Sequence, residues 1–520
     1  MAEIKVANCE SQIVGIPPFI QEQIYERLAF MRKGEEWGAK VASGEWDGVR
    51  RLFKRWNGTF PTGLVGMVRG ILRENGIEHI ATDIRAKPVR NRNWTIKMPW
   101  DLRYYQREAV DTCKRTQRGV IELPTASGKT VTFSVLIGEL AIAPTIVYVP
   151  NRLLLHQTAK DIEKFLRDID GKVLTVGKVG DGICEIKDVT VMTIQTAITA
   201  YNMVYDRNKG TIKRLTKAEI SKAGNTPYKK KRRNLEDDED EDLEFVNENK
   251  AAIKELIGSA RVVITDECHR ASSFLYQEVL KRSKAAYYRF AFSGTPWRED
   301  NTEMLITASF GRITYVKTHS ELIREGFLSR PYIIMADVPK SCVPKGSMET
   351  YRDVVKNCII DCDARNRLIA AVAKQVSPMG PTLMLVQEIP HGRALEKIIP
   401  GSKFICAKTP KTQQHEAIKD LMSGKLPILI ATPVGDEGLD LVQLKVLILC
   451  HAGRSAGKLK QRVGRTSRIH EGKSYSLVVD FRDRNEYLAS QGRDREKVFL
   501  AEEEWVIVRV TPDGWKSLTV

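Results

Sequence analysis

Between about residue 100 and residue 485, short unbroken apolar runs alternate with longer stretches of mixed polarity. Such runs are typical of strands buried on both faces of a parallel sheet, and the stretches between them of the covering helices. The first block predicts strands at Val120–Leu123, Thr145–Val149, Val189–Ile194, Arg261–Thr265 and, more weakly, Arg289–Ser293. A second block starts near residue 336 and predicts strands at Thr382–Val386, Pro427–Ala431, Val446–Cys450 and Tyr475–Val479. The pattern therefore predicts two α/β units in tandem.

The chain outside these blocks lacks the alternating pattern. Residues 1–95 predict a small α+β domain with helices at Phe19–Arg32 and Gly66–Asn75, and Asn91–Trp100 has the composition of a linker. The segment after residue 485 is polar and is expected to pack on the second block. The predicted organisation is an N-terminal domain over 1–95, a first unit over 100–335, a second over 336–485 and an extension over 486–520.

Residues 204–250 interrupt the first block with runs of like charge. A basic run, Lys229–Arg233, is followed by an acidic run, Glu236–Asp242. Blocks of like charge rarely pack, so a mobile loop is expected here. Two roles remain open: the basic half contacts a phosphate backbone, or the whole insertion is solvated and has no specific role.

The net charge of +17 and the pI near 9.3 favour a polyanionic partner, most commonly nucleic acid. No apolar run approaches the roughly 18 residues of a membrane span, and Met1–Glu10 does not resemble a signal peptide. The nine cysteines are scattered, as is usual for buried free thiols in a reducing compartment. These features predict a cytoplasmic protein with no membrane partner.

The segment Pro124–Thr130, with sequence Pro-Thr-Ala-Ser-Gly-Lys-Thr, joins a predicted strand to a helix-like run. A small-residue loop in this position presents backbone N–H groups to phosphates, Lys129 can reach the outer phosphates, and the Thr130 hydroxyl can ligate Mg²⁺. Leu123 stands where the strict P-loop pattern has glycine. The predicted nucleotide contacts in this loop are Thr125, Ser127, Gly128, Lys129 and Thr130.

Asp266 and Glu267 follow the strand predicted at Arg261–Thr265. A carboxylate pair at the carboxyl end of a strand, in the unit that also carries a phosphate loop, is the usual place for Mg²⁺–nucleotide chemistry. Asp266 can hold the metal directly or through water, and Glu267 can orient and deprotonate an attacking water. Alone the pair would be structural, but together with Gly-Lys-Thr it predicts nucleotide hydrolysis.

Four segments, taken in order, resemble motifs I, II, III and VI of superfamily 2 helicases: Gly128–Thr130, Asp266–His269, Ser293–Thr295 and Gln461–Arg468. Weaker matches lie between them, at Arg103–Gln106, Pro150–Arg152, Thr193–Thr196, Gln387–Gly392, Ala431–Thr432 and Gly438–Asp440. The resemblance covers roughly residues 100 to 485. It implies two tandem RecA-like parallel-sheet motor lobes that use ATP and Mg²⁺.

The resemblance also implies roles for residues around the nucleotide. Arg103 and Gln106 would recognise adenine, and an amide such as that of Gln106 can bond the adenine edge twice. Gly438 and Asp440 would contact the nucleotide from the second lobe. Arg465 and Arg468 lie three apart in a helix-like segment and should share one face. With Gln461 they would act in catalysis, the arginines as arginine fingers, and the alternative for the arginines is contact with nucleic-acid phosphates.

Other matched residues would couple hydrolysis to strand movement or hold the strand. The resemblance implies that Ser293 and Thr295 link to His269 and transmit hydrolysis. It places Arg152, Gln195 and Thr432 on the nucleic-acid backbone. None of these positions forms a base-reading constellation, so tracking independent of base sequence is expected.

The N-terminal region narrows the family. The segments Ser43–Gly48, Arg50–Trp56 and Phe60–Val65 resemble the N-terminal domain of the UvsW-like branch-migration helicases of T-even phages, and also the damage-recognition domain of XPB-like helicases. Cations interleaved with aromatic residues suit phosphate contact beside base stacking. The predicted nucleic-acid contacts are Arg50, Arg51, Lys54 and Arg55, whereas Trp46 and Phe53 are expected to be core residues.

The sequence thus predicts an ATP-dependent superfamily 2 DNA helicase that remodels branched DNA, such as forks, Holliday junctions, D-loops or R-loops. DNA is the expected partner, with RNA–DNA hybrids and single-strand-binding or recombination proteins as further candidates. The alternatives are an RNA or RNA–DNA hybrid helicase, the motor subunit of a restriction system, and a clamp with a degenerate ATP site. The complete set Lys129, Asp266, Glu267, Arg465 and Arg468 argues against the clamp.

Overall fold

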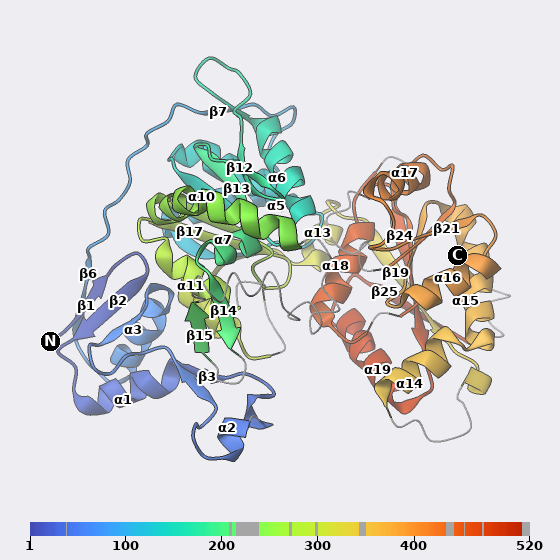
Figure 1. Cartoon of the computed structure of the whole chain (residues 1–520), viewed down its shortest axis with the longest axis horizontal. Coiled ribbons are helices and arrows are strands. Elements are labelled where there is room, and N and C mark those ends of the chain that lie inside the picture. The colour runs from blue at the N-terminus through green and yellow to red at the C-terminus, as the bar shows by residue number, and fades with distance from the viewer. Residues whose placement is uncertain are drawn as a thin grey trace. The chain divides into compact units, whose positions relative to one another are not determined.

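The computed structural model (Figure 1) describes residues 1–37, 39–206, 211–214, 239–269, 273–296, 300–342, 350–432, 441–451, 453–470 and 473–511. For residues 39–40, 205–206, 211–214 and 239–247 only the backbone is described. Contacts divide the chain into two compact units, residues 1–123 with 128–316, and residues 317–520 with the loop 124–127. The strand at 330–337 belongs to the second sheet, so the change of sheet precedes residue 335, the boundary expected from the sequence.

The N-terminal domain is a four-stranded sheet covered by two helices. The sheet has the order β5-β2-β1-β6, with β1 Ala2–Val6, β2 Glu10–Val14, β5 Thr59–Pro61 and β6 His79–Asp83. The helices α1 (Pro18–Arg27) and α3 (Val65–Glu74) contact each other. Helix α3 buries Val68, Ile71 and Leu72, which lie on one face at helical spacing. The expected small α+β domain is confirmed.

The helix predicted over Phe19–Arg32 is too long. It ends at Arg27, and Ala29–Met31 forms β3, which pairs with β4 (Val49–Arg51). The nearby short elements are η1 Glu35–Trp37, α2 Ala39–Ala42 and η2 Thr62–Leu64. Phe53 lies in the core of this domain, as expected, whereas Trp46 is only partly buried.

The first α/β sheet has the order β12-β11-β13-β9-β16-β17-β8-β18, and its pairs are parallel except β11 with β12. Its strands are β8 Arg118–Glu122, β9 Thr145–Val149, β11 Gly177–Gly180, β12 Ile183–Glu185, β13 Val189–Thr193, β16 Val262–Asp266, β17 Tyr288–Ser293 and β18 Ile313–Val316. The helices of the described residues that accompany them are α4 Tyr104–Thr116, α5 Lys129–Leu140, α6 Arg152–Phe165, α7 Ile194–Ala200, α10 Glu239–Ser259, α11 Phe274–Arg282 and α12 Glu303–Phe310. The residues of α7, α10, α11 and α12 share one apolar core with the strands, so these helices cover one face.

The N-terminal domain packs on this sheet within the same unit. Ala308 of α12 belongs to the apolar core of the N-terminal domain. A Cβ on Gly63 would lie 1.9 Å from the carbonyl oxygen of Thr307, so only glycine allows this approach. The segment expected as a linker is partly structured: Trp94 is buried, and β7 (Thr95–Ile96) pairs with β10 (Leu166–Arg167).

The charged insertion is not wholly a loop. It begins with a hairpin of β14 (Met203–Asp206) and β15 (Thr211–Arg214), and residues 239–250 belong to helix α10. The acidic run therefore enters a helix at Glu239. The basic run Lys229–Arg233 lies outside the described residues.

The second sheet has the order β21-β22-β20-β23-β24-β19-β25, and all its pairs are parallel. Its strands are β19 Arg330–Asp337, β20 Thr382–Leu385, β21 Ser402–Ile405, β22 Ile428–Ala431, β23 Val446–Leu449, β24 Tyr475–Arg482 and β25 Val506–Val510. The helices are α13 His319–Arg324, α14 Tyr351–Val355, α15 Asp363–Val376, α16 Ile389–Ile398, α17 Lys411–Met422, α18 Ala456–Thr466 and α19 Glu486–Leu500, with short turns η4 Lys340–Cys342, η5 Lys356–Ile360 and η6 Ser377–Met379. The α/β class with two parallel sheets is confirmed.

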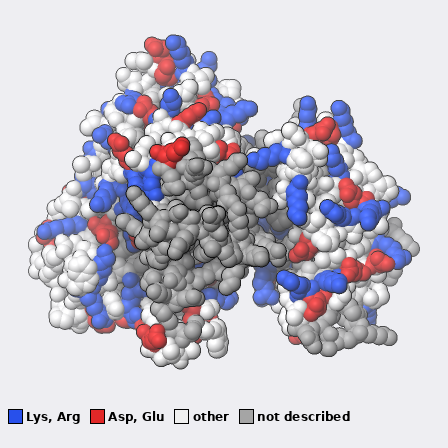
Figure 2. Space-filling model, in the orientation of Figure 1, with Lys and Arg blue, Asp and Glu red and all other residues white. Residues whose placement is uncertain are grey.

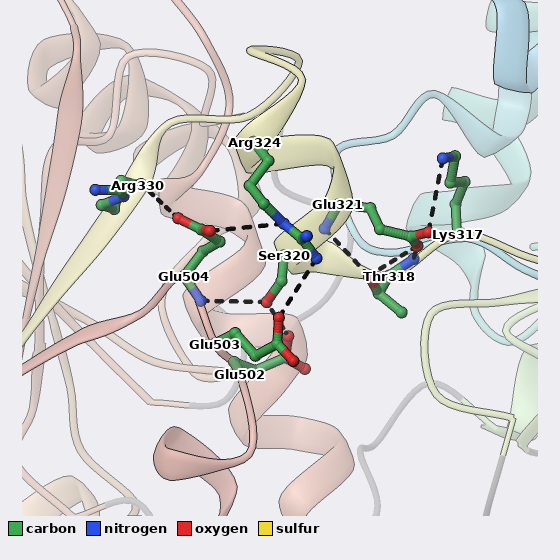
Figure 3. Close-up of polar contacts among 9 residues, drawn as sticks. All are labelled: Lys317, Thr318, Ser320, Glu321, Arg324, Arg330, Glu502, Glu503 and Glu504. Carbon is green, nitrogen blue, oxygen red and sulfur yellow. Dashed lines mark hydrogen bonds and ion pairs between the residues drawn. The ribbon is translucent and has the colours of Figure 1, made fainter.

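The segment after residue 485 is part of this unit. Helix α19 leads to β25, which adds a parallel edge strand beside β19. Between them, Glu502, Glu503 and Glu504 bind cationic and hydroxyl side chains around α13 (Figure 3). Glu502 also accepts a hydrogen bond from Lys460 of α18 at 2.6 Å. The indole N–H of Trp505 donates to Nδ1 of the buried His319 at 3.0 Å.

Acid should weaken this unit through His319. Burial, only partly offset by Glu502, lowers the pKa of His319 from 6.5 to about 4. Between those values the unfolded chain takes up a proton that the folded chain does not, so stability is complete above pH 6.5 and falls as the pH drops toward 4. The expected loss from this residue is about 2 kcal/mol at pH 5.

Thermal melting from pH 7 to pH 5 measures this effect. His319→Gln, which stays neutral and can still accept from Trp505, should show a smaller fall in melting temperature than the parent chain. Equal falls in both chains would contradict the assignment.

None of the helices in the described part of the chain combines the length and apolar character that a bilayer crossing requires. In the view of Figure 2, Lys and Arg side chains are spread over the described surface and are interspersed with Asp and Glu. The excess of 82 basic over 65 acidic residues therefore does not form a single continuous patch on this face.

Candidate active site

Three strands of the first sheet end side by side at one edge. In the order β16-β17-β8, Asp266 is in register with Phe292, and Ser293 with Glu122. Because parallel strands point the same way, the residues that follow them gather at the same edge. The phosphate-loop segment after β8, the carboxylates at the end of β16 and Ser293 are therefore neighbours in the fold.

The loop between β8 and α5 has backbone geometry that favours small residues. Ala126 and Gly128 have φ of 72° and 85°, and the Ser127 hydroxyl donates to the carbonyl of Pro124 at 2.7 Å. A Cβ on Gly128 would lie 2.5 Å from Nε2 of Gln106, so this position requires glycine. Helix α5 begins at Lys129, and no side chain caps its first turn among the described residues. The backbone N–H groups of the first turn of α5 can therefore bind a phosphate.

Glu267 lies at the centre of the polar cluster. Its Oε1 is 3.4 Å from Nζ of Lys129, and its Oε2 is 3.5 Å from Nδ1 of His269 and accepts from the Ser293 hydroxyl at 3.4 Å. Its φ of 52° is uncommon for a residue with a side chain, and such strain is concentrated at functional sites. Burial alone would raise the pKa of Glu267, but Lys129 and His269 outweigh burial and lower it to about 2. Glu267 is thus a carboxylate held by three partners.

Asp266 is the buried member of the pair. Burial, followed by the neighbouring charge of Glu267, raises its pKa to about 6. A buried carboxylate next to a second one is stabilised by a cation, and Thr130 on α5 supplies a hydroxyl in the same unit. The described residues contain no group of three or more His, Cys, Asp or Glu that could hold a metal ion. One carboxylate and one hydroxyl are oxygen donors of the kind that suits Mg²⁺, which binds few protein oxygens and keeps several waters.

Gln106 links helix α4 to the phosphate loop. It is 4% exposed, its Oε1 accepts the N–H of Arg103 at 3.2 Å, and its Nε2 faces Gly128. The Arg103 guanidinium donates to the Tyr105 hydroxyl at 3.0 Å. The amide expected to recognise adenine thus also fixes the start of α4 and the position of the loop.

The link expected between Ser293 and His269 runs through Glu267. Ser293 bonds Glu267 rather than His269, and the Thr295 N–H bonds the Ser293 hydroxyl at 3.1 Å. His269 joins the cluster through Glu267. The chain of contacts is therefore Thr295, Ser293, Glu267 and His269, with the candidate base in the middle.

The second unit places Gln461 and Arg465 four residues apart on α18, so they share one face. The expectation that Arg468 shares this face is wrong, because α18 ends at Thr466 and Arg468 follows the helix. Thr432 follows β22 and is buried, and its N–H donates to the carbonyl of Ile405 at 3.3 Å. Gly438 and Asp440 lie outside the described residues.

The cations expected to bind nucleic acid in the N-terminal domain all have carboxylate partners there. Arg50 pairs with Glu35 at 2.8 Å, Arg51 with Asp47 and Glu26, Lys54 with Glu10, and Arg55 with Glu22. Arg50 also lies over the ring of Phe274, 4.2 Å from its centre. These cations form ion pairs within the N-terminal domain. To bind a nucleic-acid phosphate, each would have to exchange its carboxylate partner for the phosphate.

On the first sheet, Arg152 begins α6, and Gln195 lies exposed on α7. Sequence reasoning missed the partner of Arg152, which is Asp181 at 3.4 Å. His156, one turn further along α6, also contacts Asp181, at 2.9 Å. An available signal was the pair Asp181-Gly182 between apolar residues, which predicts a two-residue hairpin.

Comparison with known proteins places two domains on the chain. Residues 100–298 match the type III restriction enzyme res subunit family, and residues 368–470 match the helicase conserved C-terminal domain. The first match includes the strands of the first sheet from β8 to β17, and the second includes β20 to β23 of the second sheet. The resemblance to superfamily 2 helicases expected from the sequence is confirmed by these matches.

Several known proteins are similar in sequence. A provisionally assigned helicase, helicase 22 of a Sulfolobus islandicus filamentous virus, is 28% identical over 44% of this chain and 43% of its own length. The provisionally assigned ATP-dependent helicase IRC3 of Saccharomyces cerevisiae is 21% identical over 73% of this chain and 51% of its own. The DNA 3'-5' translocase XPB2 of Sulfurisphaera tokodaii is 23% identical over 76% of this chain and 85% of its own length. The chain spans about half the length of the first two relatives.

Among solved structures, Dbp5 of S. cerevisiae bound to RNA and ADP BeF3 is 14% identical, with a TM-score of 0.51 over 80% of this chain and 91% of that chain. The type ISP restriction-modification enzyme LlaBIII bound to DNA is 13% identical, with a TM-score of 0.53 over 80% and 32%. T4 UvsW is 18% identical over 98% of this chain and 99% of its own, with a TM-score of 0.43. The first two likenesses show the fold, and the two expected RecA-like lobes are confirmed.

Proposed function

We propose that this chain, which belongs to the superfamily 2 helicases by its two domains, is an ATP-dependent motor that moves along nucleic acid and separates its strands. The observation that carries the proposal is the convergence of Lys129, Asp266 and Glu267 at one sheet edge, where Lys129 and Glu267 form an ion pair at 3.4 Å. A phosphate loop beside the buried carboxylate of Asp266 and the strained residue Glu267 is suited to hydrolysis of a nucleoside triphosphate.

The phosphate loop would hold the triphosphate. The N–H groups at the start of α5 and the side chains of Thr125, Ser127 and Lys129 are the proposed phosphate contacts, with Gly128 allowing close approach. Arg103 and Gln106 are the proposed contacts to the base, since Gln106 packs against the same loop. The Lys129 ammonium, which pairs with Glu267 in this structure, would instead interact mainly with the outer phosphates when the triphosphate is bound.

Asp266 and the Thr130 hydroxyl would hold Mg²⁺. Asp266 is buried, and burial raises its pKa, so a bound cation would stabilise its ionised form. When bound, the metal neutralises charge on the transferring phosphoryl group.

Glu267 would orient the attacking water and accept its proton. Its lowered pKa keeps it ionised at neutral pH, and its contacts with Ser293 and His269 fix the carboxylate. The Thr295 to Ser293 contact offers a route by which hydrolysis changes the neighbouring loop. Gln461, Arg465 and Arg468 are the proposed catalytic residues of the second domain, the two arginines stabilising charge on the phosphoryl group, and Gly438 and Asp440 its proposed nucleotide contacts.

For the nucleic acid, Arg152, Gln195 and Thr432 are the proposed backbone contacts. In the N-terminal domain an exposed aromatic residue supports the role proposed for the cations. Trp56 is 81% exposed in a tight turn, in which the Gly58 N–H donates to the carbonyl of Lys54 at 2.8 Å. Its neighbours Lys54 and Arg55 carry exposed ion pairs that cost little to exchange for phosphate. An indole beside two cations is suited to stacking on an unpaired base.

Branched DNA is the proposed substrate, because unpaired bases are exposed at a junction and because the segments 43–65 resemble those of branch-migration helicases. The test is a gel assay of strand separation with a fork, a Holliday junction, a linear duplex and an RNA–DNA hybrid, each with and without ATP. The fork and the junction should be processed fastest, and Trp56→Ala should reduce that preference. Equal rates on linear and branched DNA would contradict the branched substrate, and activity on the hybrid alone would favour the RNA alternative.

A further inference from the structure

The ends of three neighbouring strands bring Asp181 beside the proposed strand contacts. Strands β11, β13 and β9 are adjacent and parallel, so their carboxyl ends lie at one edge. Strand β9 leads into α6 with Arg152, and β13 leads into α7 with Gln195. Strand β11 ends at Gly180, one residue before Asp181. The topology thus places a carboxylate among side chains proposed to hold phosphates.

The turn that carries Asp181 is built tightly. Gly180 pairs with Ile183, so Asp181 and Gly182 form a two-residue hairpin loop. Their φ angles of 55° and 69° are those of a type I′ turn. A Cβ on Gly180 would lie 2.9 Å from Cγ2 of Thr193, so the hairpin is pressed against the start of α7. The position of the Asp181 carboxylate is therefore set by the fold.

The carboxylate is held by two side chains of one helix face. Arg152 and His156 are four residues apart on α6 and point the same way. Nη1 of Arg152 lies 3.4 Å from one carboxylate oxygen, and Nε2 of His156 lies 2.9 Å from the other. A guanidinium and an imidazole that grip two oxygens of one anion would serve a phosphate equally well.

We infer that Asp181 occupies the place of a strand phosphate when no nucleic acid is bound, and that a bound strand displaces it. This inference rests on the proposed function. The three side chains are between about one quarter and one half exposed, at 27% for Arg152, 43% for His156 and 26% for Asp181, so a strand can reach them. Exposed ion pairs are weak, and a phosphate can replace the carboxylate at small cost. Asp181 thereby lowers affinity for the strand and favours its release.

Asp181→Asn tests the inference without changing the turn, because Asn-Gly suits a type I′ loop as well as Asp-Gly. Glu185→Gln is the matched control, since Glu185 is exposed on β12 of the same hairpin and the variant loses the same charge. Affinity for a fluorescent single strand is measured by anisotropy on the full chain, with thermal melting to verify folding. Asp181→Asn should bind about fivefold more tightly, and Glu185→Gln like the parent.

A double-mutant cycle separates competition from a general charge effect. In an Arg152→Gln background, which should itself bind more weakly, Asp181→Asn should give little further gain. Unchanged or weaker binding by Asp181→Asn, or the same gain with Arg152→Gln, would overturn the inference while leaving the proposed function in place. A parent chain that binds no strand would overturn both.

Discussion

Lys129→Ala is expected to reduce ATP hydrolysis about 100-fold to 1,000-fold while nucleic-acid binding persists. The Lys129 side chain is 11% exposed and its Nζ lies 3.4 Å from Glu267, so solvent is poorly placed to replace the charge that Lys129 is proposed to present to the outer phosphates. Its loss also removes the strongest contribution that lowers the pKa of Glu267. The measurement is steady-state phosphate release, with strand binding followed in parallel.

Lys114→Ala is the matched control for this variant. Lys114 lies on α4 in the same unit, pairs with Glu139 at 2.7 Å and is 44% exposed, so the variant loses an equal charge away from the sheet edge. It should hydrolyse ATP like the parent chain. Full activity of Lys129→Ala would show that the triphosphate binds elsewhere.

Glu267→Gln is expected to bind ATP and to hydrolyse it about 100-fold to 10,000-fold more slowly. The amide has the shape of the carboxylate but cannot accept a proton from water. It also loses the attraction to Lys129 and His269, which leaves Lys129 free to bind phosphate. Single-turnover hydrolysis and binding of a fluorescent ATP analogue separate the two steps.

The comparison variant here is Glu278→Gln on α11. Glu278 pairs with Lys281 and Arg282 on the same helix, away from the carboxyl edge of the sheet, and its loss should leave hydrolysis unchanged. If Glu267→Gln hydrolysed ATP at the parent rate, another group would have to activate the water. If it failed to bind ATP, Glu267 would have a structural role in the loop.

The buried centre of the fold could be predicted from sequence because its strands are unbroken apolar runs. The strand at Thr145–Val149 was predicted with its observed bounds. Strand β25 (Val506–Val510) was missed because it is an edge strand in which only Val510 is buried, so it lacks the pattern of a buried strand. The helix over Phe19–Arg32 was overextended because pairing of Ala29–Met31 with a distant strand overrides local helix preference.

Part of the candidate site could also be predicted from sequence, and part could not. That Lys129, Asp266 and Glu267 lie near one another could be predicted, because each lies at or just after the end of a parallel strand and parallel strands end at one edge of the sheet. The partners of the basic residues could not be predicted, because they are set by tertiary packing. Arg55 pairs with Glu22, 33 positions earlier, and Arg152 on α6 pairs with Asp181 in the turn between β11 and β12. Net charge shows that cations are in excess but not which of them are neutralised.

The central claim is that hydrolysis at Lys129, Asp266 and Glu267 is coupled to nucleic acid. The most direct test is the rate of ATP hydrolysis by the full chain with Mg²⁺, measured without nucleic acid and with saturating single-stranded or forked DNA. Hydrolysis should be slow without nucleic acid and should rise at least about tenfold with DNA, and this rise should be absent in Lys129→Ala. Hydrolysis that is equally fast with and without any nucleic acid would contradict it.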